Sequence, residues 1–198
     1  MGANVYLVTP ASYGYKQTHT SDAIIAQFIP RRAGERISIR GFGLSAGSGA
    51  TSVYFATEIG KGTTSKAILS NATTTFALDA AISTTNPLAS NDYIAIELDD
   101  ASYQGVMVAS GSWSDFAIAE ALQDTVSTGN NVYHFGSTTD DNVIRFVCAV
   151  SVQTTDELDG GIFYANAMGK AMLVHHENDS SPNGWGSIDY LTVDYLNV

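Results

Sequence analysis

The sequence has little cysteine, little positive charge and no long apolar run, and each shortage excludes a class of protein. Cys148 is the single cysteine in 198 residues, so no disulfide framework can form. No apolar run reaches the roughly 18 residues that a membrane-spanning helix needs. The opening MGANVYLVTP has no basic segment followed by an apolar stretch. We therefore expect a protein made in the cytosol, with no secretion signal and no membrane contact.

Positive charge is scarce and is concentrated near the start of the chain. Residues 1–66 contain seven Lys and Arg against three acids, whereas residues 67–198 contain two against 17. An acidic body repels phosphate backbones, so we expect no nucleic-acid partner. Charged residues make up 15% of the chain, against about 25% in typical soluble domains. The low value favours a surface that is shared with other subunits.

Apolar residues alternate with a period of two along most of the chain, which is typical of β-strands. In DYIAIELDD, residues 92–100, the alternation predicts a strand with one buried face. A turn at residues 99–102 leads into YQGVMVAS, where Val106 and Val108 share a face, so the two segments should form a hairpin. Similar runs recur between clusters of turn residues: ERISIRGFGL, TSVYFATEI, TTFAL, NVYHF, NVIRFVCAVSV, KAMLVHHE and SIDYLTVDYLNV.

These short strands predict an all-β fold, a β-sandwich or jelly-roll-like domain over residues 35–198. Residues 1–34 are rich in tyrosine and weak in periodicity, so we expect an extended N-terminal arm that orders against a neighbour. The segment SWSDFAIAEALQDTV, residues 112–126, fits a capped helix nearly as well as a strand. Both alternatives stay open for that segment.

The sequence GLSAG, residues 43–47, matches the G-x-S-x-G pattern of hydrolases and makes Ser45 a candidate nucleophile. That mechanism needs a helix directly after the serine. Here the chain continues as SGATSVYFATEI, a glycine-serine stretch into another strand. We interpret GLSAG as a turn between two strands, and we expect no catalytic residue, no cofactor and no enzymatic activity.

The stretch HHENDSSPNGWGSID, residues 175–189, holds the densest group of potential ligands. Adjacent residues on a strand point to opposite faces, so His175 and His176 are poorly placed to share one zinc ion, and one of them should face solvent. Residues 179–184 resemble the start of a calcium loop, but Tyr190 stands where the anchoring glutamate would be. We expect no metal, and we predict a polar loop in a C-terminal hairpin between KAMLV and DYLTVDYLNV.

A basic cluster, PRRAGERISIR, carries four arginines. Arg31 and Arg32 precede a predicted strand on which Arg36 and Arg40 share a face, so the four could form one patch. Aromatic residues for base stacking are absent from this segment, which favours a protein partner over nucleic acid.

Two segments resemble parts of bacteriophage head-associated proteins. Residues 92–135, DYIAIELDDASYQGVMVASGSWSDFAIAEALQDTVSTGNNVYHF, are similar to a strand of the type D-Y-I-x-I-x-L-D-D, a turn, a second strand and an A-L-x(n)-S-x-G-N-x-V-Y sequence. The opening YLVTPASYGYK, followed by FIPRRAGERISIRGFG, resembles the start of small virion proteins encoded near the coat protein. The resemblance implies a capsid cement or decoration protein of a tailed phage, with a jelly-roll-like fold, a trimeric state and no catalytic residues.

The first functional hypothesis is therefore a structural virion protein on the capsid surface. It would bind the major capsid (coat) protein as a homotrimer and stabilise contacts between coat subunits. The residues predicted to contact the coat are Arg31, Arg32, Arg36, Arg40, Tyr13 and Tyr15. An alternative is a carbohydrate- or receptor-binding β-sandwich module of a phage fibre, with Trp113 or Trp185 as a sugar platform. A third hypothesis, a hydrolase, would depend on Ser45.

Overall fold

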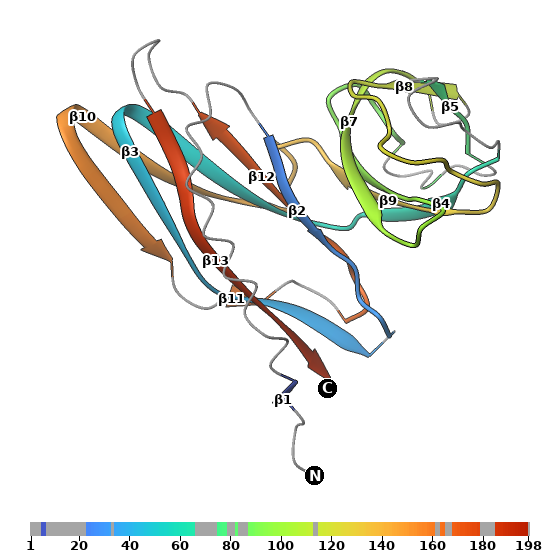
Figure 1. The fold of residues 1–198 in the computed structure, drawn as a ribbon, viewed down its shortest axis with the longest axis horizontal. Coiled ribbons are helices and arrows are strands. Elements are labelled where there is room, and N and C mark those ends of the chain that lie inside the picture. The colour runs from blue at the N-terminus through green and yellow to red at the C-terminus, as the bar shows by residue number, and fades with distance from the viewer. Residues whose placement is uncertain are drawn as a thin grey trace. The chain divides into compact units, whose positions relative to one another are not determined.

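The computed structural model describes residues 5–6, 23–32, 34–65, 75–78, 82, 87–112, 115–160, 163–164, 168–178 and 185–197. The predicted all-β fold is confirmed, because the regular elements of this part of the chain are strands in two antiparallel sheets (Figure 1). The chain divides into two compact units: unit 1 comprises residues 1–55 and 144–198, and unit 2 comprises residues 56–143. The division into an arm over 1–34 and one domain over 35–198 stays a prediction.

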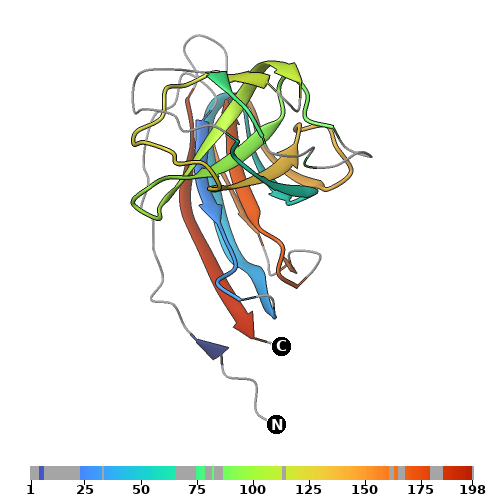
Figure 2. The same ribbon diagram turned by 90° about the vertical axis from the view of Figure 1, so that its right-hand side faces the viewer.

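The described strands of unit 1 form a seven-stranded sheet in the order β1-β13-β3-β12-β2, and β10 and β11 also pair with β3. Its central strands run side by side in both views (Figure 1 and Figure 2). Within the first 34 residues, β1 pairs with β13 and β2 pairs with β12. The bounds are Val5–Tyr6 for β1, Ala23–Phe28 for β2, Glu35–Thr57 for β3, Val143–Gly160 for β10, Phe163–Tyr164 for β11, Met172–Asn178 for β12 and Trp185–Asn197 for β13.

The long strand β3 corrects one prediction. Residues 43–47 do not form a turn between two strands but lie inside β3, which continues without a break to Thr57. Strand β13 pairs with this region up to Gly47, so the backbone of GLSAG is satisfied by a partner strand. Gly49 has a φ of 101°, a conformation that glycine adopts without steric cost. Gly49 therefore takes a backbone conformation that is unusual for a strand, and β3 continues beyond it to Thr57.

The predicted C-terminal hairpin is also wrong. Strands β12 and β13 do not pair with each other, because β3 lies between them in the sheet. The pairs that β13 makes instead run from Trp185 opposite Gly47 to Asn197 opposite Glu35. Sequence neighbours usually pair, but here a strand from the first third of the chain offers the longer partner. The loop 179–184 lies outside the described residues.

Unit 1 has an apolar core built from β3, β12 and β13. Phe42 is fully buried, and its ring centroid lies 5.3 Å from that of Phe55 and 4.7 Å from that of Phe146. Such tilted aromatic pairs add stability beyond the area that they bury. The described members of this core are Ile37, Ile39, Phe42, Leu44, Ala46, Val53, Phe55, Met172, Val174 and Leu191.

Unit 2 is a six-stranded antiparallel sheet in the order β4-β9-β6-β7-β8-β5. Just beyond the two edge strands, Thr64 and Leu78 form a further antiparallel bridge, and the Ser65 N–H donates to the Ala77 carbonyl at 3.0 Å. The sheet thus closes on itself, which removes exposed edges. The bounds are Gly60–Thr63 for β4, Thr75–Phe76 for β5, Tyr93–Glu97 for β6, Tyr103–Ser112 for β7, Asp115–Ile118 for β8 and Asn131–Gly136 for β9.

The predicted hairpin of unit 2 is confirmed. Strands β6 and β7 pair antiparallel with Ile94 opposite Val106, and Val106 and Val108 are both fully buried. Ala101, in the connecting turn, has a φ of 64°, a left-handed conformation that glycine adopts at lower cost. For the ambiguous segment 112–126, the structure shows a strand over Asp115–Ile118.

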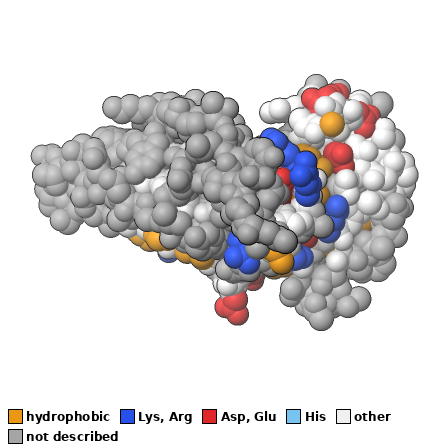
Figure 3. Space-filling model, turned by 90° about the horizontal axis from the view of Figure 1, so that it is seen from below, with side chains coloured by type: hydrophobic (Ala, Val, Ile, Leu, Met, Phe, Trp, Pro, Cys, Tyr) orange, Lys and Arg blue, Asp and Glu red, His pale blue; other side chains and the backbone are white. Residues whose placement is uncertain are grey.

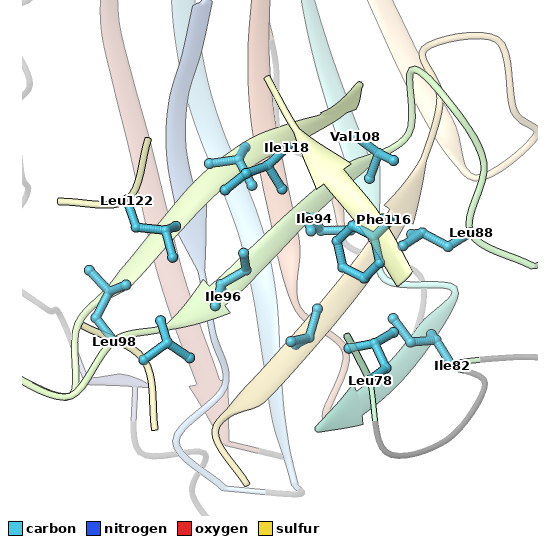
Figure 4. Packing of buried hydrophobic residues seen from close by; sticks show 13 residues of the cluster. Leu78, Ile82, Leu88, Ile94, Ile96, Leu98, Val108, Phe116, Ile118 and Leu122 are labelled. Atoms are coloured by element: carbon cyan, nitrogen blue, oxygen red, sulfur yellow. The ribbon is translucent and has the colours of Figure 1, made fainter. Parts of the chain in front are cut away.

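Side chains from β6, β7, β8 and β9 fill the interior of the closed sheet (Figure 4). Phe116 is 1% exposed and Ile94 is fully buried. Leu122 and Val126, in the chain that follows β8, complete the packing. The described core residues are Leu78, Ile82, Leu88, Ile94, Ile96, Leu98, Val106, Val108, Phe116, Ile118, Leu122, Val126 and Val132.

Candidate contact surface

Arg31 and Arg32 lie side by side in the turn between β2 and β3, and both are exposed. The Arg31 backbone N–H donates to Glu35 Oε2 at 2.6 Å, and the Glu35 N–H donates to the Arg32 carbonyl at 3.0 Å. The Arg31 guanidinium lies 5.6 Å from the centroid of the Tyr195 ring, a cation–π distance. The turn therefore holds two cationic side chains at the start of β3 while leaving them open to solvent.

Arg36 differs from these two residues. It is half-buried in β3 opposite Leu196, and its Nε is buried without a hydrogen-bond partner in the described part of the chain. The backbone of Arg40 lies in β3, but its side chain lies outside the description, as do Tyr13 and Tyr15. Of the six predicted contact residues, the structure thus brings Arg31 and Arg32 together at the surface.

Arginine at such a surface is suited to carboxylates. Its planar guanidinium donates two parallel hydrogen bonds to one carboxylate group, and it keeps its charge at any ordinary pH. Figure 3 shows described Lys and Arg side chains at the surface that is seen from below. This chemistry is available to an acidic protein partner.

The paired histidines of β12 are not a surface site. His175 and His176 are 3% and 0% exposed, so the expectation that one faces solvent is wrong. Strand β12 lies between β3 and β2 in the sheet. Residues 171–176 are all buried, so the side chains on both faces of β12 are shielded from solvent. His176 Nε2 lies 2.5 Å from Thr51 Oγ1, whereas His175 Nδ1 lies 3.9 Å from Glu177 Oε1. The two rings contact different groups.

The surroundings of His175 form a polar cluster across β3, β10 and β12, which is buried at His175, half-buried at Glu177 and exposed at Arg145. Burial lowers the pKa of His175 to about 4, so its ring is neutral at neutral pH. The Tyr54 hydroxyl donates to Glu177 Oε2 at 2.5 Å, and the Tyr54 ring lies 5.9 Å from the ring of His175. The Arg145 guanidinium donates to Ser52 Oγ at 3.0 and 3.2 Å and lies 5.3 Å from the centroid of the Tyr54 ring. These contacts join strands and do not open onto a described cavity.

The structure describes the remaining predicted sites only in part. Ser45 lies in mid-strand opposite Ser187, not on a strand-to-helix elbow. The side chains of Trp113 and Trp185 lie outside the description. Within the described ranges, no group of three or more His, Cys, Asp and Glu side chains could hold a metal ion. The same ranges contain no helix long and apolar enough to cross a membrane.

Comparisons with known proteins add little to this picture. No family model matches the chain, and no curated protein matches it. Among solved structures, a weak similarity is found to VP17, a capsid protein of bacteriophage P23-77, with 11% identity over 96% of this chain and 92% of that chain. The TM-score is 0.21, so this similarity carries no argument about fold or function.

Proposed function

We propose that this protein is a structural component of a tailed-phage particle. It binds the outside of the capsid as a cement or decoration protein and stabilises contacts between coat subunits, acting as a homotrimer. The observation that carries the proposal is the pair of exposed arginines, Arg31 and Arg32, on a chain that is otherwise strongly acidic. The resemblance of residues 92–135 and of the opening segment to phage head-associated proteins supports it.

The contact proposed is between the arginine segment and acidic groups of the major coat protein. The Arg31–Arg32 turn is anchored by Glu35, which is 6% exposed. A fixed turn reduces the entropy that the side chains lose when they bind. Arg36, Arg40, Tyr13 and Tyr15 are proposed to extend this surface. Because the contact is ionic and partly exposed, it should weaken as salt rises.

The test is co-sedimentation of the purified chain with capsids of its own phage. We expect binding that saturates at a fixed number of copies per coat subunit. Replacing both surface arginines, Arg31→Gln with Arg32→Gln, should weaken binding roughly tenfold or more, because two charge-assisted contacts are lost. Binding of the wild-type chain should also decrease between low and high salt.

The matched control removes two positive charges from unit 2, Lys61→Gln with Lys66→Gln. This variant should bind almost as well as the wild type. Equal losses in the two double variants would show that only net charge matters and would overturn the contact proposed here. Absence of the chain from purified particles, measured by mass spectrometry, would overturn the virion role itself.

The trimer is tested separately by sedimentation velocity. A species with three times the 21.0 kDa mass of one chain is expected at micromolar concentration. A chain that stays monomeric both alone and on the capsid would contradict this part of the proposal. Binding to a glycan panel without binding to capsids would instead favour the fibre module.

A further inference from the structure

Unit 2 contains a cavity of about 590 Å³ that the proposed function does not use. Its size falls within the range of small-molecule sites in proteins. The described lining residues are Ile59, Pro87, Ala89, Ser90, Asp92, His134, Ser137, Asp140, Asp141 and Asn142. Three of these residues are carboxylates, and none is lysine or arginine.

A buried polar pair forms part of the lining. His134 is 1% exposed and Asp92 is 6% exposed, and His134 Nε2 lies 2.8 Å from Asp92 Oδ2. The Ala89 N–H donates to the same oxygen at 2.7 Å. His134 lies opposite Ile94 on the interior face of the closed sheet, so the pair interrupts an otherwise apolar interior. Burying such a pair costs free energy, which makes its position at a cavity informative.

One atom of this pair has no hydrogen-bond partner among the residues that the structure describes. Since a carboxylate can only accept, the His134–Asp92 bond places a proton on Nε2, and the imidazole tautomer that carries only this proton presents Nδ1 as an acceptor. Nδ1 is buried and has no hydrogen-bond partner in the part of the chain that the structure describes. A buried nitrogen without a partner carries a cost that a donor on a ligand could offset.

The remaining polar groups of the lining are also acceptors. Asn142 donates its amide protons to the carbonyls of Thr57 and Phe135 at 2.6 and 2.8 Å, so its Oδ1 is the atom left to accept. Asp140 Oδ2 accepts the Ser137 N–H at 2.7 Å. Asp141 is exposed and makes no hydrogen bond or ion pair with described residues. Lys61, the described lysine of this unit, lies over the Tyr133 ring at 4.8 Å and does not line the cavity.

We propose that this cavity binds a small organic cation that carries ammonium or guanidinium groups. Such a ligand offers only donors, which match the carboxylates, the Asn142 amide oxygen and the His134 imidazole nitrogen. Its positive charge complements Asp140 and Asp141, which no described lysine or arginine side chain contacts. Ile59 and Pro87 give apolar surface to the carbon chain of the ligand. A bare metal ion fits less well, because the described acidic and histidine side chains do not converge on one point.

The test is titration of the full-length protein with spermidine and agmatine, followed by calorimetry and by amide chemical shifts in NMR. We expect saturable binding and the largest shifts at Ser90, Ser137 and Asn142. Asp141→Asn should weaken binding roughly fivefold, the effect of one partly exposed ion pair. The substitution is at an exposed position without described partners, so the fold should be unaffected.

Two further variants separate the site from general charge attraction. Glu120→Gln removes an exposed acid of the same unit that does not line the cavity, and it should leave binding unchanged. His134→Leu should weaken binding while the thermal unfolding curve shows that the protein still folds. Equal weakening by Glu120→Gln and Asp141→Asn would overturn the proposal. Binding of glucose as tightly as spermidine, or no binding at millimolar spermidine, would overturn it too.

Discussion

The two units of this chain carry very different charge. Unit 1 contains seven basic and nine acidic residues, whereas unit 2 contains two basic and eleven acidic residues. The exposed arginines belong to unit 1, and the cavity lined by aspartates belongs to unit 2. One chain of low overall charge density thus separates the proposed surface for acidic partners from the proposed site for cations. Composition averaged over the whole chain hides this separation.

The interiors of the two units differ as well. In unit 1, β3 and β12 bury Thr51, His175 and His176 beside the apolar core. In unit 2, the strands enclose an apolar interior in which the Asp92–His134 pair lies at the cavity. Buried hydrogen-bonded groups contribute little net stability but are costly to disturb. Unit 1 should therefore be the more sensitive to pH, and unit 2 the more sensitive to loss of apolar volume.

The largest expected effect comes from Phe116→Ala in unit 2. Removing a fully packed ring leaves a cavity and should cost about 3–5 kcal/mol of unfolding free energy. The tryptophans serve as one probe per unit, because Trp113 belongs to unit 2 and Trp185 to unit 1. In variants that keep one tryptophan each, the urea midpoint followed by Trp113 fluorescence should decrease more than the midpoint followed by Trp185 fluorescence.

The corresponding core substitution in unit 1 is Phe42→Ala. It should lower the urea midpoint followed by Trp185 more than the midpoint followed by Trp113. Identical shifts of both transitions in both variants would mean that the chain unfolds as one cooperative body. In that case the comparison between two separately stabilised units would be wrong.

The second prediction concerns how the stability of unit 1 depends on pH. Because burial lowers the pKa of His175 to about 4, below the usual value near 6.5, the unfolded chain takes up this proton first as the pH falls. The stability of unit 1 should be intact above about pH 6.5 and should decrease by up to about 3 kcal/mol towards pH 4. Urea unfolding followed by Trp185 at pH 7 and pH 4.5 measures the change. His175→Gln should remove most of this pH dependence.

Unit 2 should respond to acid at lower pH. Desolvation raises the pKa of Asp99, but hydrogen bonds from Thr125, Ser127 and Asn130 outweigh this and lower it below its usual value. The stabilisation from a carboxylate with a lowered pKa is present above the unfolded pKa and is lost as the pH falls through the folded value. The Trp113 transition should therefore change little between pH 7 and 4.5. A loss there equal to that of unit 1 would contradict the comparison.

A smaller effect is expected from Thr51→Val. The two side chains have nearly the same shape, so the change removes little besides the hydroxyl, which contacts His176 Nε2 and donates to the Glu177 carbonyl at 3.3 Å. Loss of these contacts should cost about 1–3 kcal/mol. The Trp185 transition measures this cost, and Thr57→Val, at a half-buried strand position in unit 2, serves as the control. A cost at Thr51 no larger than at Thr57 would mean that the contacts of Thr51 do not stabilise unit 1.

The smallest effect is expected from Ala101→Gly, in the turn between β6 and β7. Ala101 has a φ of 64°, which costs a residue with a Cβ about 1–2 kcal/mol. Glycine relieves this cost but adds freedom to the unfolded chain, so a net gain of about 0.5–1 kcal/mol is expected. The opposite change at Gly129, with a φ of 93°, should destabilise unit 2. Thermal unfolding of both variants shows whether each change raises or lowers the stability of unit 2.

Local pattern was sufficient to predict several elements. The alternation at 92–100 and the polar turn after it predicted the β6–β7 hairpin, because both strands and their connection lie within twenty residues. The arginine turn could be predicted for a similar reason, since Pro30 is followed directly by two arginines and then by a predicted strand. The same local reasoning failed at GLSAG and at the C-terminal hairpin, where the partner strand is more than 100 residues away.

The sequence by itself determined that this protein is all-β, that its positive charge is placed early in the chain, and that strands β6 and β7 pair. Period-two alternation and turn residues act over short distances, so they can be recognised without a fold. Only the tertiary structure decided that β3 lies between β12 and β13, that both histidines of β12 are buried, and that Asp92 and His134 meet at a cavity. Each depends on contacts between strands that are remote in sequence, and no local pattern encodes the partner.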